Sequence, residues 1–245
     1  MTVTTGKTKR VLAANAENYR KMYSRGAAFL QYPADWVVRF HNMYLKTNLP
    51  RGRALDFGCG AGNNSCFLAE KGYEVSGVDV SSEALRLVRK NLAMKHLHKS
   101  LIKRFRVIDP GTTCLPFPDD YFDFILSNQV LYYLPTSKDI HSTNRELARC
   151  LKPGGIVFFT MMGPKNYYIR EHVKKVVGKR LCDVRIEDRA HRLYGVHEMI
   201  YLVKTRKELV SLFSEFECLS VGYFDQAMFD MHSNFHWIFI GRKRS

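Results

Sequence analysis

Long apolar runs are missing from this sequence, since none approaches the ~20 residues that a helix needs to cross a membrane. The N-terminus, MTVTTGKTKR, carries positive charge without the apolar segment of a secretory signal. Internal repeats and low-complexity segments are missing as well. These absences disfavour membrane-spanning, secreted and solenoid proteins. A length of 245 residues and an apolar fraction of 46% then suit one globular domain.

Cysteine is sparse, and its 6 residues form no metal-binding pattern. No two of them make a CxxC pair and none joins a CxxH cluster, so we expect no structural zinc and no other bound metal. Cys59, Cys66 and Cys150 lie within apolar patterns, which predicts buried, small hydrophobic side chains. Free cysteines of this kind fit a reducing compartment, and we expect a cytoplasmic protein.

Acidic residues are fewer than basic ones, with 23 Asp and Glu against 38 Lys and Arg and a net charge of +15. The longest basic zone, from Arg86 to Arg106, contains no acidic residue, and a second basic zone over 165–180 contains a single acidic residue, Glu171. Such a field favours an anionic partner: a phosphorylated metabolite, an acidic glycan or nucleic acid. A plain solvated surface explains the same residues equally well.

Short apolar segments alternate with amphipathic ones, which predicts an α/β protein with a parallel sheet covered by helices on both faces. We expect strands over 54–57, 73–80, 105–109, 121–128, 156–162, 216–224 and 236–243. We expect helices over 63–72, 83–95, 137–151 and 205–216, with Ser81 or Ser82, Ser137 and Thr205 as N-caps.

Two segments lie outside this alternation. Residues 1–47 are expected to form an N-terminal tail and a helical cap. Residues 48–245 are expected to form the main domain, in which 163–204 is a basic, tyrosine-bearing insertion after the fifth strand. Because parallel strands end at one edge of their sheet, we expect the ligand at that edge.

The stretch Gly58-Cys59-Gly60-Ala61-Gly62 lies between the first strand and the helix that follows it. Glycines allow a tight turn and let the backbone approach a ligand closely. Asp79 ends the next strand, where its carboxylate can accept the hydroxyls of a ribose. The third glycine comes one position too early for the nicotinamide fingerprint GxGxxG, and the sequence has no GxxxxGK[ST] phosphate loop.

Four segments resemble the signatures of the class I S-adenosylmethionine-dependent methyltransferases: LDFGCGAG, VSGVDVS, LPFPDDYFDFILSNQVLYYL and LARCLKPGGIVFFT. The resemblance is to the small-molecule enzymes of type 11 and of the ubiquinone-biosynthesis kind. It covers residues 53–162 in good register and 205–242 more loosely. It implies S-adenosylmethionine as cofactor, S-adenosylhomocysteine as product, and a Rossmann-like seven-stranded, mostly parallel sheet whose last strand is antiparallel.

The resemblance also implies where the cofactor lies. In the family, the glycine loop contacts the methionine part, and an acid before it supports the loop and the amino group. An acid after the second strand holds the ribose, one after the third faces the adenine amino group, and the tip of the fourth strand lies near the methyl group. The matching cofactor-binding positions are Asp56, Gly58, Gly60, Gly62, Asp79, Val80, Asp109 and Asn128.

Methyl transfer from a sulfonium is an in-line displacement, so the protein mainly aligns the acceptor and excludes water. A general base is needed only where the acceptor holds its proton tightly, and the sequence contains no obvious catalytic triad. Our catalytic candidates are Tyr132, Tyr133 and His172. A tyrosine pKa of about 10 makes a poor base, and packing beneath the cofactor explains both tyrosines equally well.

Acceptor recognition is expected from the two segments outside the alternating pattern. Tyr19, Tyr23 and Tyr32 of the helical cap are candidates for a lid or for core packing. Tyr167, Tyr168 and Arg170 lie in the insertion, where the family places acceptor-recognition elements. His172, His191 and His197 have no convincing metal-ligand spacing.

Three functions remain open from the sequence. The first is a methyltransferase acting at oxygen or nitrogen of a small, anionic acceptor. The second is an RNA methyltransferase, which the charge favours but which lacks an aromatic-interleaved basic strand. The third is a protein that binds the cofactor without catalysis. A monomer or a homodimer is expected in each case.

Overall fold

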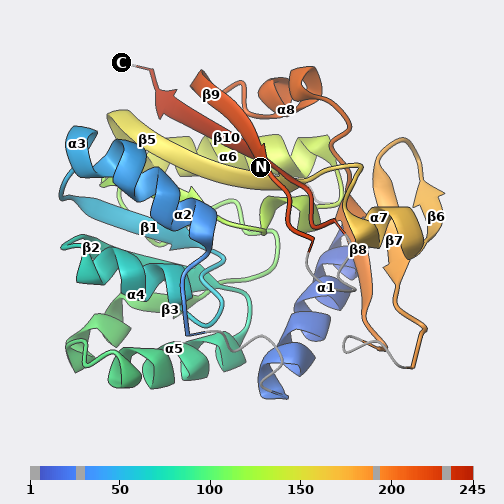
Figure 1. Cartoon of the computed structure of the whole chain (residues 1–245), viewed down its shortest axis with the longest axis horizontal. Coiled ribbons are helices and arrows are strands. Elements are labelled where there is room, and N and C mark those ends of the chain that lie inside the picture. Colours follow the sequence, from blue (N-terminus) through green and yellow to red (C-terminus); the bar gives the residue numbers. More distant parts are fainter. Residues whose placement is uncertain (1–5, 26–30, 190–193, 228–232, 245) are drawn as a thin grey trace.

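A seven-stranded sheet forms the centre of this computed structural model, which describes residues 6–25, 31–189, 194–227 and 233–244 (Figure 1). In spatial order the strands are β3 (Phe105–Val107), β2 (Glu74–Asp79), β1 (Arg53–Phe57), β4 (Phe122–Ser127), β5 (Leu151–Met162), β10 (His236–Lys243) and β9 (Phe216–Phe224). β10 runs antiparallel to both of its neighbours, β5 and β9. The other paired strands are parallel. The predicted fold, with its antiparallel last strand, is therefore confirmed.

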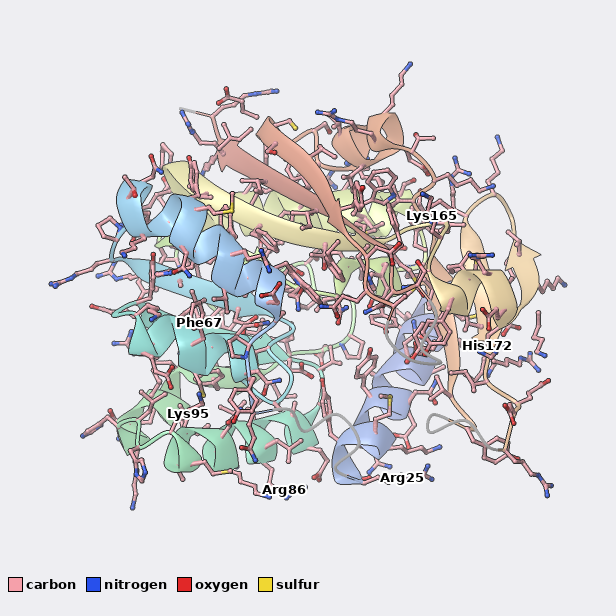
Figure 2. All side chains as sticks on the ribbon, viewed as in Figure 1. Arg25, Phe67, Arg86, Lys95, Lys165 and His172 are labelled. Atoms are coloured by element: carbon pink, nitrogen blue, oxygen red, sulfur yellow. The ribbon has the colours of Figure 1, made fainter. Side chains whose placement is uncertain are left out.

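Helices cover both faces of this sheet. One face carries α2 (Asp35–Phe40), the π-helix η1 (His41–Leu45), α3 (Lys46–Asn48), α4 (Asn63–Glu70) and α5 (Ser82–Met94). The other face carries α6 (Ser137–Cys150), α8 (Arg206–Leu212) and the 3₁₀ turn η3 (Leu131–Tyr133), and a second 3₁₀ turn, η2 (Lys99–Arg104), precedes β3. Arg86 of α5 lies on the outer side of this helix, away from the sheet, whereas Lys95 directly after the helix lies toward α4 and pairs with Glu70 (Figure 2).

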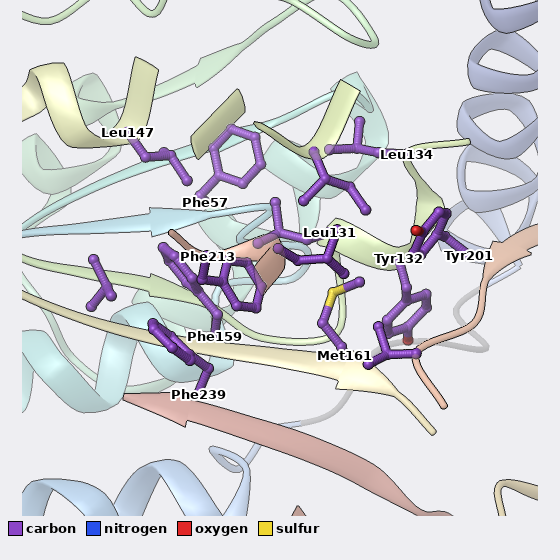
Figure 3. Close-up of a cluster of buried hydrophobic side chains, with 14 of the residues drawn as sticks. Phe57, Leu131, Tyr132, Leu134, Leu147, Phe159, Met161, Tyr201, Phe213 and Phe239 are labelled. Atoms are coloured by element: carbon purple, nitrogen blue, oxygen red, sulfur yellow. The ribbon is translucent and has the colours of Figure 1, made fainter. Parts of the chain in front are cut away.

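Alternation along the strands divides the core in two. Ala54, Phe124 and Phe158 pack beneath α2, α4 and α5, whereas Leu55 and Phe159 pack beneath α6 and α8. Phe159, Phe213 and Phe239 form the aromatic centre of the second cluster, and the ring centroid of Phe213 lies 5.2 Å from that of Phe159 and 4.8 Å from that of Phe239 (Figure 3). Both faces of the central strands are thus buried, as a parallel sheet requires.

The insertion is an ordered second sheet, which the sequence analysis did not predict. After α7 (Tyr167–Glu171), the antiparallel strands β6 (Val173–Val177), β7 (Leu181–Arg185) and β8 (His197–Tyr201) pair in that order. Only β7 and β8 bury side chains on the body of the protein, whereas β6 keeps its two lysines in solvent. Because both lysines of β6 are exposed, its sequence lacks the alternation of apolar and polar residues that predicts a strand.

α1 (Gly6–Ser24) lies between the carboxyl edge of the main sheet and β8 (Figure 1). It begins at Gly6, so part of the expected tail is helical. Asn15 joins it to two other elements. Its amide nitrogen donates to the carbonyls of Tyr133 and Met199 at 3.2 and 2.9 Å, and its amide oxygen accepts from Met199 N at 3.0 Å. The helical cap is thereby tied to the insertion.

Several element ends differ from the predictions. Thr136, not Ser137, caps α6, because the Thr136 hydroxyl accepts from the backbone N–H of Asp139. Thr205 caps α8 as predicted, but the Ser81 hydroxyl forms no capping bond at α5. β5 begins at Leu151, so the KPGG segment belongs to the strand.

Candidate active site

The glycine loop after β1 has a backbone that only glycine adopts easily. Gly58, Gly60 and Gly62 have φ of +76°, +52° and +79°. A Cβ atom on Gly58 would lie 2.3 Å from a methyl carbon of Val130, and one on Gly60 would lie 2.8 Å from the Tyr23 hydroxyl. The loop thus has left-handed turns and close neighbours on both sides.

Asp79 lies at the end of β2, directly beside this loop. It is 6% exposed. Its Oδ2 atom accepts from Gly60 N and its Oδ1 atom from Ser81 N, each at 2.9 Å. Burial raises the pKa of Asp79 although these backbone bonds favour its charged form. Each carboxylate oxygen has a further lone pair, which gives the capacity to accept both hydroxyls of a ribose.

A cavity of about 420 Å³ opens between this loop, the strand ends and α1. Its volume lies in the range of small-molecule sites. The lining residues include the glycine loop and the ends of β2, β3 and β4, among them Gly58, Gly60, Asp79, Val80, Ile108, Asp109, Asn128 and Gln129. The carboxyl edge of a parallel sheet is where ligands bind in open α/β folds.

These residues fit the cofactor that the resemblance implies. Asp79 supplies acceptors for a ribose, and Val80 and Ile108 supply apolar surface beside it. Asp109, on the segment after β3, also lines the cavity and can accept from an adenine amino group. Gly58 and Gly60 line the cavity with backbone alone, which leaves room for the methionine part to approach the loop.

Two of the predicted cofactor positions lie behind the cavity and do not line it. Asp56 is buried and accepts from Ser65 Oγ at 2.6 Å, and burial raises the pKa of Asp56 to about 7. It joins β1 to α4 and so supports the loop from below. Gly62 begins α4, and its backbone oxygen accepts from Cys66 N at 2.8 Å.

The tip of β4 is fixed by contacts from two other elements. Asn128 Oδ1 accepts from Trp36 Nε1 at 2.8 Å and from Thr160 Oγ1 at 3.4 Å. The next residue, Gln129, has φ of +61°, a backbone conformation that residues other than glycine seldom adopt. Its N–H donates to Thr160 Oγ1 at 2.7 Å. This strained turn directs the chain into η3, where the two tyrosine candidates lie.

The adjacent tyrosines of η3 point in different directions. Tyr133 lines the cavity, whereas Tyr132 packs in the hydrophobic core near Met161 (Figure 3). The Tyr132 ring lies 5.7 Å from that of His236. Burial raises the pKa of both tyrosines. Of the two tyrosines of η3, only Tyr133 is therefore in a position to contact a molecule bound in the cavity.

Three further tyrosines line the cavity: Tyr19 and Tyr23 of α1 and Tyr168 of α7. Tyr23 lies over the glycine loop and is 7% exposed. The Tyr19 hydroxyl shares a hydrogen bond with that of Tyr133. These residues line the cavity next to the loop and η3.

The remaining acceptor-side and catalytic candidates lie outside the cavity lining. Tyr32 is 75% exposed, and Lys95 Nζ lies 5.7 Å from its ring centroid. Tyr167 packs on Tyr168, and the edge of the His172 ring faces Tyr167 at 5.8 Å. Arg170 lies in the last turn of α7. His191 is outside the described residues.

Sequence analysis missed a buried acid, Glu198 of β8. It is 5% exposed, and its Oε2 atom accepts from the Tyr133 hydroxyl at 3.2 Å. Burial raises the pKa of Glu198 to about 7. The sequence does contain a signal for this residue. In HEMIY, the inward positions of the strand are Glu198 and Ile200, so an acidic residue occupies a position where alternation predicts an apolar one.

The described residues of the site include no cationic side chain in the cavity lining and no metal-binding cluster. Lys, Arg and His are absent from the cavity lining in the part of the chain that the structure describes. The same part holds no group of three metal-binding side chains, and none of its helices could span a membrane. Outside, acids partly neutralise the basic zone of α5 and η2: Arg86 pairs with Glu83, Lys95 with Glu70 and Arg104 with Glu74.

Comparisons with known proteins find similarity to methyltransferases. The family described as "Methyltransferase domain" matches residues 55–159. The ubiquinone biosynthesis O-methyltransferase of Azoarcus sp. (strain BH72) is 31% identical over 126 residues, which cover 51% of this chain and 49% of that protein. The malonyl-[acyl-carrier protein] O-methyltransferase of Salmonella typhimurium is 29% identical over 154 residues, 63% of this chain and 54% of that protein.

The structural comparison supports the fold. A SAM-dependent methyltransferase from Methanosarcina mazei aligns with a TM-score of 0.64 and 24% identity, over 87% of this chain and 99% of that one. The matched segments span about half the length of the curated relatives. What those whole proteins act on is therefore a statement about them alone.

Proposed function

From the premise that this chain carries a class I S-adenosylmethionine-dependent methyltransferase domain, we propose that it moves a methyl group to an oxygen or nitrogen atom of a small acceptor. The observation that carries the proposal is the cavity that begins at the glycine loop and Asp79 and ends at the tyrosines of α1 and η3. When bound, S-adenosylmethionine supplies a methyl group on a sulfonium leaving group. The protein then needs to align the acceptor and exclude water.

We propose that the cofactor binds at the strand ends described above. Asp79 would hold the ribose hydroxyls, and Asp109 would accept from the adenine amino group. Gly58 and Gly60 would lie against the methionine part, with Asn128 at the reacting end. Tyr23 closes this part of the cavity from above, because α1 lies over the loop.

The sequence favours an anionic acceptor, and the charges of the cavity lining restrict where the acceptor's own charge can lie. A phosphate or carboxylate in the cavity would meet no Lys, Arg or His among the described lining residues, and it would face Asp79 and Asp109. Burying an unpaired charge there would be costly. We therefore place the uncharged, reacting end of the acceptor in the cavity and any anionic portion outside, toward Lys165 and Arg170 near α7.

Oxygen is favoured over nitrogen as the acceptor atom. The site offers tyrosine hydroxyls and a buried carboxyl beside η3, and both can take part in removing a proton from a hydroxyl. A reducing, cytoplasmic location fits the free cysteines of the described residues.

Calorimetric titration tests the cofactor, with S-adenosylhomocysteine as ligand and NADH and ATP as controls. Selective binding in the micromolar range is expected. Transfer of tritium from [methyl-³H]S-adenosylmethionine to a mixture of small hydroxyl and amine acceptors, and separately to total RNA, tests the reaction. Label in RNA with a steep salt dependence would favour an RNA methyltransferase. Failure of a folded, ligand-free sample to bind S-adenosylhomocysteine would overturn the proposed function.

A further inference from the structure

A buried tyrosine–glutamate pair lies at the acceptor end of the cavity. Tyr133 follows the tip of β4 and lines the cavity, and Glu198 lies behind it, outside the lining. The carboxylate can only accept a hydrogen bond, so the Tyr133 hydroxyl donates its single proton to Glu198 Oε2. In the bond between the two tyrosines, Tyr19 must then be the donor and Tyr133 the acceptor. The second lone pair on the Tyr133 oxygen is then shared between the neighbouring Tyr132 hydroxyl and a molecule in the cavity.

Three separate elements hold this arrangement in place. Tyr19 comes from α1, Tyr133 from η3 and Glu198 from β8. Asn15 bonds to the backbone of Tyr133 and, twice, to that of Met199, the neighbour of Glu198. The tyrosine and the carboxyl are therefore fixed relative to each other by a side chain that belongs to neither. A purely packing role would not need a carboxyl here.

We infer that Glu198 is the proton acceptor of the reaction and that Tyr133 is the catalytic residue that passes the acceptor's proton to it. The inference rests on the proposed function and narrows the acceptor to a molecule with a neutral, protonated hydroxyl at its reacting end. Tyr19 is a positioning residue, because its bond orients the Tyr133 oxygen.

The step balances in atoms and in charge. The acceptor oxygen forms a bond to the methyl carbon, the carbon–sulfur bond breaks, and its electron pair stays on sulfur. The acceptor's proton goes to the Tyr133 oxygen while the Tyr133 proton goes to the Glu198 carboxylate. The positive sulfonium and the negative carboxylate are neutralised together, which suits a buried site that disfavours isolated charge.

Among the residues that the structure describes, none supplies Glu198 with a counter-charge that would hold it permanently ionised. Opposite it on β7 stands Val184, and the cationic side chains of β7 and β8, Arg185 and His197, pair instead with Asp183. Besides Tyr133, the titratable groups that interact with Glu198 are tyrosines of α1, η3 and α7: Tyr19, Tyr23, Tyr132 and Tyr168. Burial raises the pKa of the carboxyl to about 7, so it can give and take a proton near neutral pH.

Two probe acceptors of different acidity test the relay. Phenol has a hydroxyl like that of tyrosine, with a pKa of about 10. 4-Nitrophenol is far more acidic and is ionised at pH 8, so it brings no proton that must be removed. At pH 8 we expect Glu198→Gln and Tyr133→Phe to lower the turnover of phenol about 100-fold or more. The turnover of 4-nitrophenol by the wild type should be low, because its anion enters a cavity whose described lining has no cation, and neither variant should lower it further.

Matched variants and a second readout complete the test. Tyr73→Phe removes a hydroxyl that donates to the Leu49 carbonyl outside the cavity lining, and it should leave both turnovers unchanged. Tyr19→Phe should cause a smaller loss with phenol than Tyr133→Phe. In protein labelled with [¹³C]glutamate, one carboxyl resonance should titrate near pH 7, be missing from Glu198→Gln, and titrate at higher pH in Tyr133→Phe. The wild-type phenol rate should rise with the same titration.

The outcomes separate this inference from the proposed function. Equal losses with both phenols would mean a structural role and would overturn the relay, as would no loss at all. A wild-type protein that binds S-adenosylhomocysteine but methylates neither phenol would also overturn the relay, and the proposed function would stand. Absence of cofactor binding would overturn the proposed function itself. If Glu198→Gln does not fold, Tyr133→Phe decides alone, because its ring can keep the same packing.

Discussion

Removing the carboxylate of Asp79 should abolish most of the affinity for S-adenosylhomocysteine. Asp79→Ala would take away the two charge-assisted hydrogen bonds that Asp79 is proposed to make to the ribose, each worth about 1.5–3 kcal/mol. Their sum of about 3–6 kcal/mol corresponds to a loss in affinity of roughly 10² to 10⁴. Isothermal titration calorimetry of the wild type and the variant measures the loss directly.

The same substitution also removes partners inside the protein, so the design needs controls. The N–H groups of Gly60 and Ser81 lose the acceptors that they have at 2.9 Å. Asp79→Asn keeps one of these acceptors and most of the volume, and a thermal melt of each variant separates loop disorder from lost ribose contacts. Asp119→Ala removes a carboxylate that is 75% exposed and pairs with Arg149, and it should leave the affinity unchanged. A folded Asp79→Ala protein with wild-type affinity would refute the ribose role.

Three further predictions concern the loop, the buried acid and metals. Gly60→Ala should lower the melting temperature and weaken cofactor binding, because φ of +52° costs about 1–2 kcal/mol for alanine and the new Cβ would contact the Tyr23 hydroxyl. Adding Tyr23→Phe should relieve only the steric contact and not the backbone strain. An unchanged melting temperature would contradict this account. Glu198 binds its proton more tightly when folded, with a pKa of about 7 against 4.5, so its contribution to stability is present below pH 4.5 and lost as the pH rises toward 7. Urea unfolding from pH 5 to 8 should therefore show a fall of about 3 kcal/mol that is missing in Glu198→Gln, and parallel curves would be evidence against a buried carboxyl. Methyl transfer should persist in EDTA, because the proposed steps use no metal, and its loss with recovery on adding Mg²⁺ would contradict them.

The cofactor half of the site was predictable because its residues are local in sequence. A glycine loop, the strand before it and the acid at the end of the next strand lie within one strand–helix–strand unit, whose geometry is fixed by backbone rules. Asp79 and the glycines therefore lie where the sequence pattern put them. Val80, Asp109 and Asn128 line the cavity for the same reason, since each follows the end of a strand.

The acceptor half was predictable only in part, because it depends on contacts between distant segments. Tyr132 and Tyr133 are neighbours in the chain, and successive side chains of a 3₁₀ turn point about 120° apart, so only one of them can face the cavity. Sequence does not say which one. Likewise, the alternation in HEMIY indicates that Glu198 points inward, but only the packing of β8 on α1 and η3 gives that face its partner.

The same division bears on the proposed acceptor. The family match covers residues 55–159, which includes the cofactor loop and Tyr133 but neither Tyr19 nor Glu198. The segments that close the acceptor end, α1 and β8, therefore lie outside the part that defines the family. Similarity to a relative therefore says more about the proposed cofactor of this chain than about its acceptor. The acceptor is better sought from this chain's own cavity, whose described lining has four tyrosines and no cation. A screen should accordingly begin with neutral hydroxyl compounds and vary the charge only at the end that stays outside.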